Sequence, residues 1–300
     1  SEPTNRKIIQ AGLDSAVAEP CFPIIVAHGH VLSLLDRDDV DYVLAPNIIS
    51  QQTRWMNTES HLCPWHQTLP FVVRRAPRVE ERAGRLLTPT VRFRQGRENV
   101  RREMEQFLLA HALGRRLKLR RAKIASAVSA AFAAQDEFAA KCLAAGRDAM
   151  DTLRRTGAPG IVLLGRPYNV HDAGVNLSVA RKLRDHYGVN CVPLDFLDTD
   201  PVDVRGMNDN MFWNLGRQIL AAARIVAEHP NLHIVHITNF KCGPDSFLKH
   251  YIRPASGKPF LTLQFDGHSN DAGIMTRCEA YLDSKGILRP RREELVSAPA

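Results

Sequence analysis

The stretch 161–193, IVLLGRPYNVHDAGVNLSVARKLRDHYGVNCVP, decides the fold class of this chain. It begins with a short apolar run at residues 161–164, which is typical of a buried strand. A helical segment follows at residues 177–187, with Asn176 as its N-cap and Gly188 as its stop. A second apolar run then predicts the next strand. A strand, a helix and a strand in this order indicate a unit with parallel strands.

The same alternation continues toward the C-terminus. Residues 158–285 are predicted to form a C-terminal α/β lobe with a doubly wound parallel sheet, followed by a frayed tail at residues 286–300. We expect strands at residues 161–164, 189–193, 232–237 and 260–265, and further helices at residues 212–228, 246–251 and 272–284. Ligand sites in open parallel sheets lie beyond the carboxyl ends of strands, so the loops after these strands are of interest.

The first half of the chain predicts a smaller lobe and a connecting section. Residues 1–73 indicate an N-terminal α/β lobe, with a helix at 22–35 and strands at 15–19, 41–45 and 69–73. Residues 74–157 show almost no strand pattern and indicate a helical, Arg-rich section. The complete prediction is an α/β fold of two Rossmann-like parallel-sheet lobes joined by a helical, basic section.

The composition is that of a globular protein. With 44% hydrophobic and 24% charged residues, the chain is neither disordered nor fibrous. No apolar run reaches the roughly 18 residues of a membrane span, and the first residues lack the apolar stretch of a signal peptide. We therefore expect a cytoplasmic protein with reduced thiols and no membrane partner. The chain begins with Ser1, so we expect it to be processed or part of a longer protein.

The net charge of +8 is concentrated in one section. Residues 74–123 hold 16 basic and 5 acidic side chains, a local excess of 11. Three interpretations stay open for this section: a solvated helical surface, a docking face for an acidic electron-donor protein or sibling domain, and a nucleic-acid interface. The nucleic-acid interpretation is the weakest, because no known reader motif or interleaved aromatic residues accompany the charge. We expect no nucleic-acid partner.

The six cysteines form two groups. Cys142, Cys191 and Cys278 lie within predicted helices or strands and indicate packing. The other three, Cys21, Cys63 and Cys242, each have a proline one or two residues later and precede a plausible helix start.

A helix N-terminus favours a thiolate, which is the form of cysteine that binds metal. Three thiolates from distant segments suit an iron–sulfur cluster better than zinc, which usually takes four ligands in close pairs. The alternative is three unrelated loop cysteines.

Seven short motifs occur in order along the chain. They are CFP at residues 21–23, AHGH at 27–30, DYVLAP at 41–46, CP at 63–64, GRPYN at 165–169, NFKCGPDSF at 239–247 and DAG at 271–273. This ordered set resembles the 2-hydroxyacyl-CoA dehydratase superfamily, and within it the branch of CoA-substrate-specific enzyme activase-associated proteins. No phosphate-binding loop is present in the chain, so an ATPase must lie elsewhere.

The resemblance implies a [4Fe–4S] cluster held by Cys21, Cys63 and Cys242, with Gly243 beside it. It implies an oxygen-sensitive protein that receives electrons from an ATP-dependent activase, either a separate chain or a fused domain. It further implies reductive or radical chemistry on an acyl-CoA, and an assembly that is a homodimer or a heterodimer. The alternative is a non-catalytic electron-transfer or docking module of a larger activase protein, so the sequence leaves open whether the chain is an enzyme.

Three further side chains are candidates for catalysis. Asp245 and Ser246 stand next to Cys242, and His268 follows the last predicted strand. Helix capping is the alternative role for the first two, and turn stabilisation for the third. The family usually has Glu where this chain has Gly267, so a carboxylate is missing there.

Overall fold

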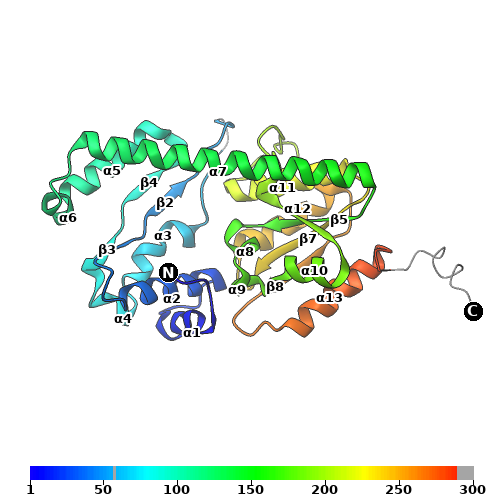
Figure 1. The fold of residues 1–300 in the computed structure, drawn as a ribbon, viewed down its shortest axis with the longest axis horizontal. Helices are drawn as coiled ribbons and strands as arrows, with labels where there is room; N and C mark the ends of the chain where they lie inside the picture. Colours follow the sequence, from blue (N-terminus) through cyan, green and yellow to red (C-terminus); the bar gives the residue numbers. More distant parts are fainter. Residues whose placement is uncertain (57–58, 289–300) are drawn as a thin grey trace, which may run out of the picture.

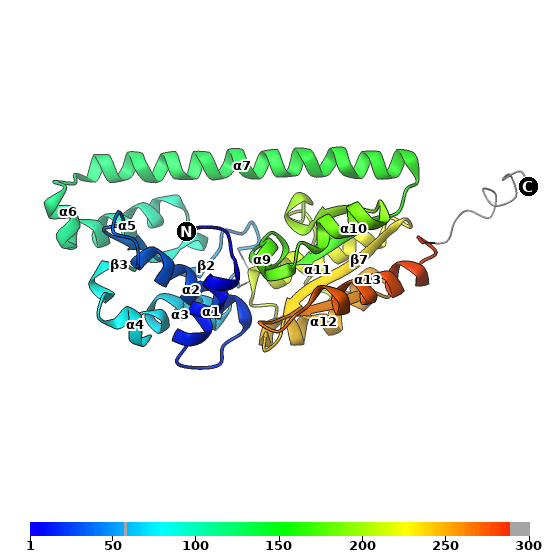
Figure 2. The ribbon, with the colours of Figure 1, turned by 60° about the horizontal axis from the view of Figure 1, so that its bottom comes forward.

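The computed structural model describes residues 1–56 and 59–288 as two α/β lobes (Figure 1). The first lobe contains the elements from α1 to α6, and the second those from β5 to α13. A single long helix, α7 (Arg121–Thr156), lies alongside both lobes (Figure 2). All strand pairs of the named strands are parallel, so the predicted α/β fold with parallel sheets is confirmed.

The C-terminal lobe is built on a four-stranded sheet in the order β6-β5-β7-β8. One apolar cluster packs α11 and α12 on one face of the sheet, and a second packs α10 and α13 on the other. Its strands are β5 (Gly160–Gly165), β6 (Asn190–Pro193), β7 (Leu232–Asn239) and β8 (Leu261–Phe265). Its helices are α8 (Pro167–Val170), α9 (Ala173–Asn176), α10 (Val179–Tyr187), α11 (Asn214–Ala227), α12 (Gly243–Ser256) and α13 (Asp271–Ser284), with the 3₁₀ turn η3 (Leu194–Phe196).

The first predicted helix of this lobe, at residues 177–187, begins two residues later than expected, and a separate short helix precedes it. Asn176 ends α9 and is not an N-cap, and α10 begins only at Val179. Leu177 and Ser178 both adopt positive φ between them. The Asn176 amide instead donates to the carbonyls of Asn169 and Val170 at 2.8 and 2.7 Å, which holds the loop after β5 against the sheet.

The N-terminal lobe contains two separate pairs of short strands. β1 (Val43–Leu44) pairs with β3 (Leu86–Leu87), and β2 (Asn47–Ser50) with β4 (Thr90–Arg92). Two of these strands lie in the section expected to hold only helices. The strands expected at 15–19 and 69–73 are wrong: the first is the end of α1 with its following loop, and the second lies inside α3.

Helices form most of the N-terminal lobe. Two glycines bring α1 and α2 into close contact, because a Cβ at Gly12 would lie 2.1 Å from the Ile25 carbonyl oxygen, and one at Gly29 would lie 1.9 Å from that of Ile8. The helices are α1 (Arg6–Ser15), α2 (Phe22–Leu35), α3 (Pro64–Val73), α4 (Pro77–Glu80), α5 (Arg97–Ala110) and α6 (Ala112–Arg116), with the 3₁₀ turns η1 (Ala83–Arg85) and η2 (Phe93–Gln95).

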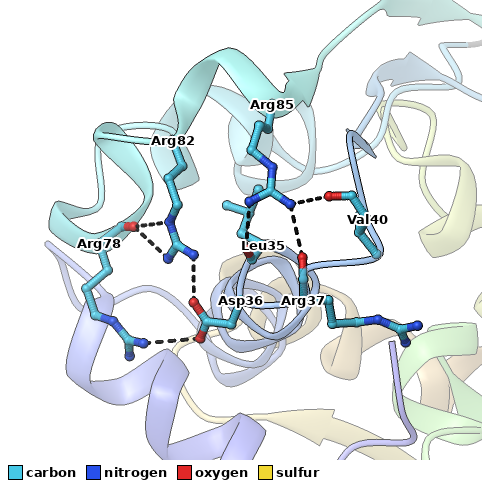
Figure 3. Close-up of polar contacts among 7 residues, drawn as sticks. All are labelled: Leu35, Asp36, Arg37, Val40, Arg78, Arg82 and Arg85. Atoms are coloured by element: carbon cyan, nitrogen blue, oxygen red, sulfur yellow. Dashed lines mark hydrogen bonds and ion pairs between the residues drawn. The ribbon is translucent and has the colours of Figure 1, made fainter.

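Part of the basic section fastens the C-terminal end of α2 (Figure 3). Arg85 donates to the backbone carbonyls of Leu35, Arg37 and Val40, and thereby satisfies groups that the helix end leaves unpaired. Arg78 and Arg82 bind the carboxylate of Asp36, the C-cap residue, at 3.2 and 2.7 Å. Arg78, Arg82 and Arg85 of the basic section therefore stabilise the fold and are more than part of a solvated surface.

The remaining features concern the ends of the chain and the membrane. Residues 286–288 form a turn and a bend after the last helix, and Ile287 and Leu288 pack against the core of the C-terminal lobe. The rest of the predicted tail, residues 289–300, lies outside the described residues. In residues 1–56 and 59–288, no helix is both long and apolar enough to cross a bilayer.

Candidate functional site

The three proline-associated cysteines are all N-cap residues of helices. Cys21 begins α2, Cys63 begins α3 and Cys242 begins α12. Each has extended backbone, with ψ of 154°, 155° and 100°, and each helix has proline in its first two positions. The prediction that each of these residues stands at a helix start is confirmed. Cys242 also follows strand β7, as expected, whereas Cys21 follows α1 and a loop and not a strand.

These cysteines lie where the two lobes meet. Cys21 and Cys63, from the N-terminal lobe, line a cavity of about 220 Å³ together with Tyr168 and Asp172 of the C-terminal lobe. Cys242 does not line this cavity, but its sulfur is close enough to Cys21 for their charges to interact. The structure therefore brings two of the thiols into one cavity and the third within electrostatic reach.

Direct hydrogen bonds hold the lobes together around this cavity. Thr4 donates to the Asp172 carboxylate at 2.5 Å, and its hydroxyl lies 2.8 Å from Nε2 of His30. Asn214 at the start of α11 donates to Ser60 at 2.9 Å. Because both ends of the interface are fixed in this way, the relative positions of the thiols depend on both lobes.

The thiols are buried more strongly than the sequence indicates. Cys242 is 9% exposed, and burial raises the pKa of Cys21 to about 11 and that of Cys242 to about 12. The backbone N–H groups of Ile24 and Asp245 favour the thiolates, but burial outweighs them. The expected lowering of the thiol pKa at a helix N-terminus is therefore wrong for these two residues, which are protonated at neutral pH.

A buried ion pair lies beside the cysteines. Arg166, which directly follows β5, is 1% exposed, and its Nη2 lies 2.9 Å from Oδ1 of Asp245. Asp245 also accepts a hydrogen bond from Thr238 at 2.6 Å. Burial alone would raise the pKa of Asp245, but the guanidinium of Arg166 lowers it below its usual value. The carboxylate of Asp245 is therefore charged and bound to Arg166. Asp245 was predicted as a candidate for catalysis next to Cys242, and in the structure it is the partner of Arg166.

Arg166 links this pair to the thiols. Its positive charge interacts with Cys21, Cys63 and Cys242, and it lowers the pKa of the first and third against the effect of burial. Sequence reasoning quoted Arg166 within the GRPYN motif but gave it no role. A charged residue directly after a fully buried strand was the available signal.

Two aromatic side chains complete the cavity wall. The rings of His66 and Tyr168 meet edge to face with centroids 6.1 Å apart. Burial lowers the pKa of His66, and the charge of Arg166 lowers it further, so the imidazole is neutral. Next to Tyr168, Asn169 is completely buried, and neither polar atom of its side chain has a hydrogen-bond partner within the described part of the chain.

The other predicted site residues do not line the cavity that holds Cys21 and Cys63. Ser246 is exposed and lines a separate polar pocket with Lys249 and Arg277. His268 is exposed, and its backbone N–H donates to Asp266 at 2.8 Å in the turn after β8. Gly243 is exposed, with no heavy atom within 4 Å of a Cβ built on it.

Gly267, at the position where a carboxylate was expected, faces the start of α2. A Cβ there would lie 3.6 Å from Leu13 and 3.9 Å from Phe22, the residue after Cys21. The loop after β8 is thus adjacent to the N-terminal lobe.

The three cysteines are of the residue type that binds an iron–sulfur cluster, but they are not placed to bind a single metal ion. Across residues 1–56 and 59–288, no three His, Cys, Asp or Glu side chains are placed to hold one metal ion. In a four-iron cluster each thiolate binds a different iron, so the ligands need not converge on one point. A cluster bound by thiolates carries negative charge. The N-termini of the three helices and the guanidinium of Arg166 favour negative charge at this place.

The comparisons with known proteins agree with the coarse part of the sequence interpretation. We found no significant match to this chain among curated proteins or among solved structures. One family, described as the CoA enzyme activase uncharacterised domain (DUF2229), matches residues 1–197, nearly two thirds of the chain. The matched range includes Cys21, Cys63 and Arg166, and it ends before Cys242. The chain therefore belongs to the CoA enzyme activase uncharacterised domain family.

Proposed function

We propose that this chain is an iron–sulfur protein that receives electrons from an ATP-dependent CoA enzyme activase and serves reductive or radical chemistry. One observation carries the proposal: three cysteines from both lobes are N-caps of helices and interact with the same buried arginine. Membership of an activase family supports an activase as partner. The iron–sulfur role rests on the cysteines and on the resemblance to 2-hydroxyacyl-CoA dehydratases.

Cys21, Cys63 and Cys242 would hold a [4Fe–4S] cluster, which supplies one-electron transfer when bound. The thiols must lose their protons on binding, so assembly is expected to depend on pH. The N–H groups at the starts of α2, α3 and α12 and the guanidinium of Arg166 would stabilise the negative charge. Because Asp245 neutralises part of this cation, the local charge is balanced before the cluster binds.

The interlobe cavity gives a substrate access to two of the thiols. Its 220 Å³ is smaller than the roughly 300–1,000 Å³ of sites that enclose a whole small molecule. It would therefore hold only the acyl end of an acyl-CoA, against Tyr168 and His66. The nucleotide end would remain outside this cavity.

A second candidate is a non-catalytic electron-transfer or docking module. The exposure of Ser246 and His268 favours it, because neither of these two candidates for moving a proton lines the cavity that holds Cys21 and Cys63. Gly267 also offers no carboxylate near Cys21. Reduction by an activase and ATP, without turnover of any 2-hydroxyacyl-CoA, would favour this module over an enzyme.

Anaerobic reconstitution with iron and sulfide tests the proposal. We expect four irons and four sulfides per chain in a [4Fe–4S] protein. The absorbance of the thiolate-to-iron band should be lost on exposure to air. Cys21→Ser, Cys63→Ser and Cys242→Ser should each lose the cluster. The matched control is Cys142→Ser, a change at a buried cysteine of α7, which should keep it. Absence of iron from the wild-type chain, or equal iron in all four variants, would refute the proposal.

A further inference from the structure

A large apolar cavity lies far from the cysteines, under the first half of α7. It has a volume of about 530 Å³, is open to solvent on one side, and is lined by α5, α7 and the loops and strands around β1 and β4. Every side chain that lines it is apolar except Lys123 and Gln135. One of the lining side chains, Leu44, is 57% exposed although it is large and apolar. The cavity therefore offers apolar surface that residues 1–56 and 59–288 leave uncovered.

Contacts between α5 and α7 close one end of this cavity. There, Arg97 of α5 binds Asp136 of α7 at 2.6 Å. The same guanidinium lies 4.9 Å from the centroid of the Phe132 ring, which also meets Phe93 edge to face. Toward the other end, Ile124 of α7 is 4% exposed.

The charge at the two ends of the cavity is very different. Asp136 neutralises Arg97 at one end, whereas residues 106–135 contain no Asp or Glu at all. Four cations precede or begin α7, and none of them has an ion-pair partner among the described residues. They are Lys118, Arg120, Arg121 and Lys123. Lys123 also lines the cavity, so the apolar space ends at unpaired positive charge.

We propose that this cavity binds the acyl chain of a soluble anionic amphiphile such as a fatty acid, with the anionic head group against Lys123 and the cations before it. An apolar space with one charged end matches an apolar chain with one charged end. The volume lies within the roughly 300–1,000 Å³ of small-molecule sites.

The proposal does not depend on the proposed iron–sulfur function, because none of the cavity residues contacts the three cysteines.

Isothermal titration of the full chain with laurate tests the proposal. We expect saturable binding of one laurate per chain, weakening as salt screens the head group. Dodecanol, which has the same chain without the charge, should bind about threefold to fivefold more weakly. Vesicles of phosphatidylglycerol provide the second source of an acyl chain. Sedimentation of the chain with vesicles, without binding of laurate, would overturn the proposal in favour of a membrane surface.

Matched variants on α7 locate the binding. Ala131→Trp fills the cavity and should weaken laurate binding about tenfold or more, because two or more methylene groups lose their space. Ala133→Trp is the control on the same helix, at an exposed residue that does not line the cavity, and should leave the affinity unchanged. Ala127→Trp fills the same cavity from another position and replaces Ala131→Trp if that variant does not fold.

A second pair of variants tests the charged end. Lys123→Glu should weaken laurate binding more than dodecanol binding, whereas Arg155→Glu, at the far end of α7, should change neither. Equal effects of Ala131→Trp and Ala133→Trp, or no binding of laurate to the wild-type chain, would overturn the proposal. So would a dimer in solution that Ala131→Trp dissociates, because the occupant would then be a second copy of the chain.

Discussion

The two lobes position their cysteines by different means. In the C-terminal lobe, a four-stranded sheet with an apolar cluster on each face fixes the loop after β7, and with it Cys242. In the N-terminal lobe, two pairs of short strands and smaller apolar clusters leave this task to helix contacts. There α1 packs tightly on α2, and Arg85 fastens the end of α2. The relative positions of the cysteines therefore depend both on the sheet of the C-terminal lobe and on the helix contacts of the N-terminal lobe.

The largest loss of stability is expected when the buried ion pair of the C-terminal lobe is broken. Asp245→Ala leaves Arg166 buried without its partner, which typically costs about 3–5 kcal/mol of the free energy of unfolding. Urea unfolding of the wild-type and variant chains measures this difference. The double variant Arg166→Met, Asp245→Leu should recover most of the loss. The control Asp203→Ala removes an exposed ion pair with Arg205 and should change the free energy little. A loss no greater than that of the control would contradict the assignment.

A steric change addresses the N-terminal lobe. Gly29→Ala places a methyl group 1.9 Å from the Ile8 carbonyl oxygen, so α1 and α2 must separate. Overpacking of this kind costs about 1–3 kcal/mol, although alanine itself favours helix. Gly84→Ala is the matched control, because no heavy atom lies within 4 Å of its Cβ. Equal melting temperatures of the two variants would show that the close contact of α1 and α2 is unimportant.

The arginine at the end of α2 is expected to matter slightly less. Arg85→Leu removes the donor shared by four carbonyls, those of Leu35, Arg37, Val40 and Asp41, and we expect a loss of about 1–2 kcal/mol because the site is partly open to water. Arg74→Leu is the control at an exposed arginine of the same section. Hydrogen exchange of the last turn of α2 should accelerate only in the Arg85 variant. Protection that stays the same in both would mean that water satisfies these carbonyls equally well.

The smallest effect concerns pH and a contact within the C-terminal lobe. The hydrogen bond from His171 to Asp195 raises the pKa of His171 above its ordinary value of 6.5. The resulting stabilisation is complete below pH 6.5 and is lost as the pH rises through the raised pKa. Because the pair is partly exposed, we expect less than about 1 kcal/mol. His171→Gln should therefore lower the melting temperature near pH 5 and not near pH 9; the opposite order would contradict the assigned hydrogen bond.

The two lobes also differ in how far the sequence predicts them. Long alternating segments predict β5, β7 and α11 correctly, because each buries a continuous apolar face in one sheet. The run at residues 69–73 has a strand-like composition, but it continues α3, and its Val73 packs against Leu32 and Leu35 of α2. The strands at residues 86–92 are too short to show a period and depend on partners more than 40 residues earlier.

The sequence predicts the helix starts at the three cysteines but not the electrostatics around them. Proline after each cysteine correctly indicates a helix N-cap, since this is a local property of the chain. Burial by the opposite lobe, which raises the pKa of Cys21 and Cys242, is not visible in the sequence around them. Nor is the pairing of Arg166 with Asp245, which are 79 residues apart.

The most direct test of the proposed site is the position of iron in the reconstituted protein. Anomalous diffraction at the iron edge, from crystals grown without oxygen, should give one peak per chain between the starts of α2, α3 and α12. Crystals of Cys142→Ser should give the same peak, and those of Cys242→Ser should give none. A peak elsewhere on the chain, or iron bound by Cys21 and Cys63 with α12 uninvolved, would contradict a cluster shared between the lobes.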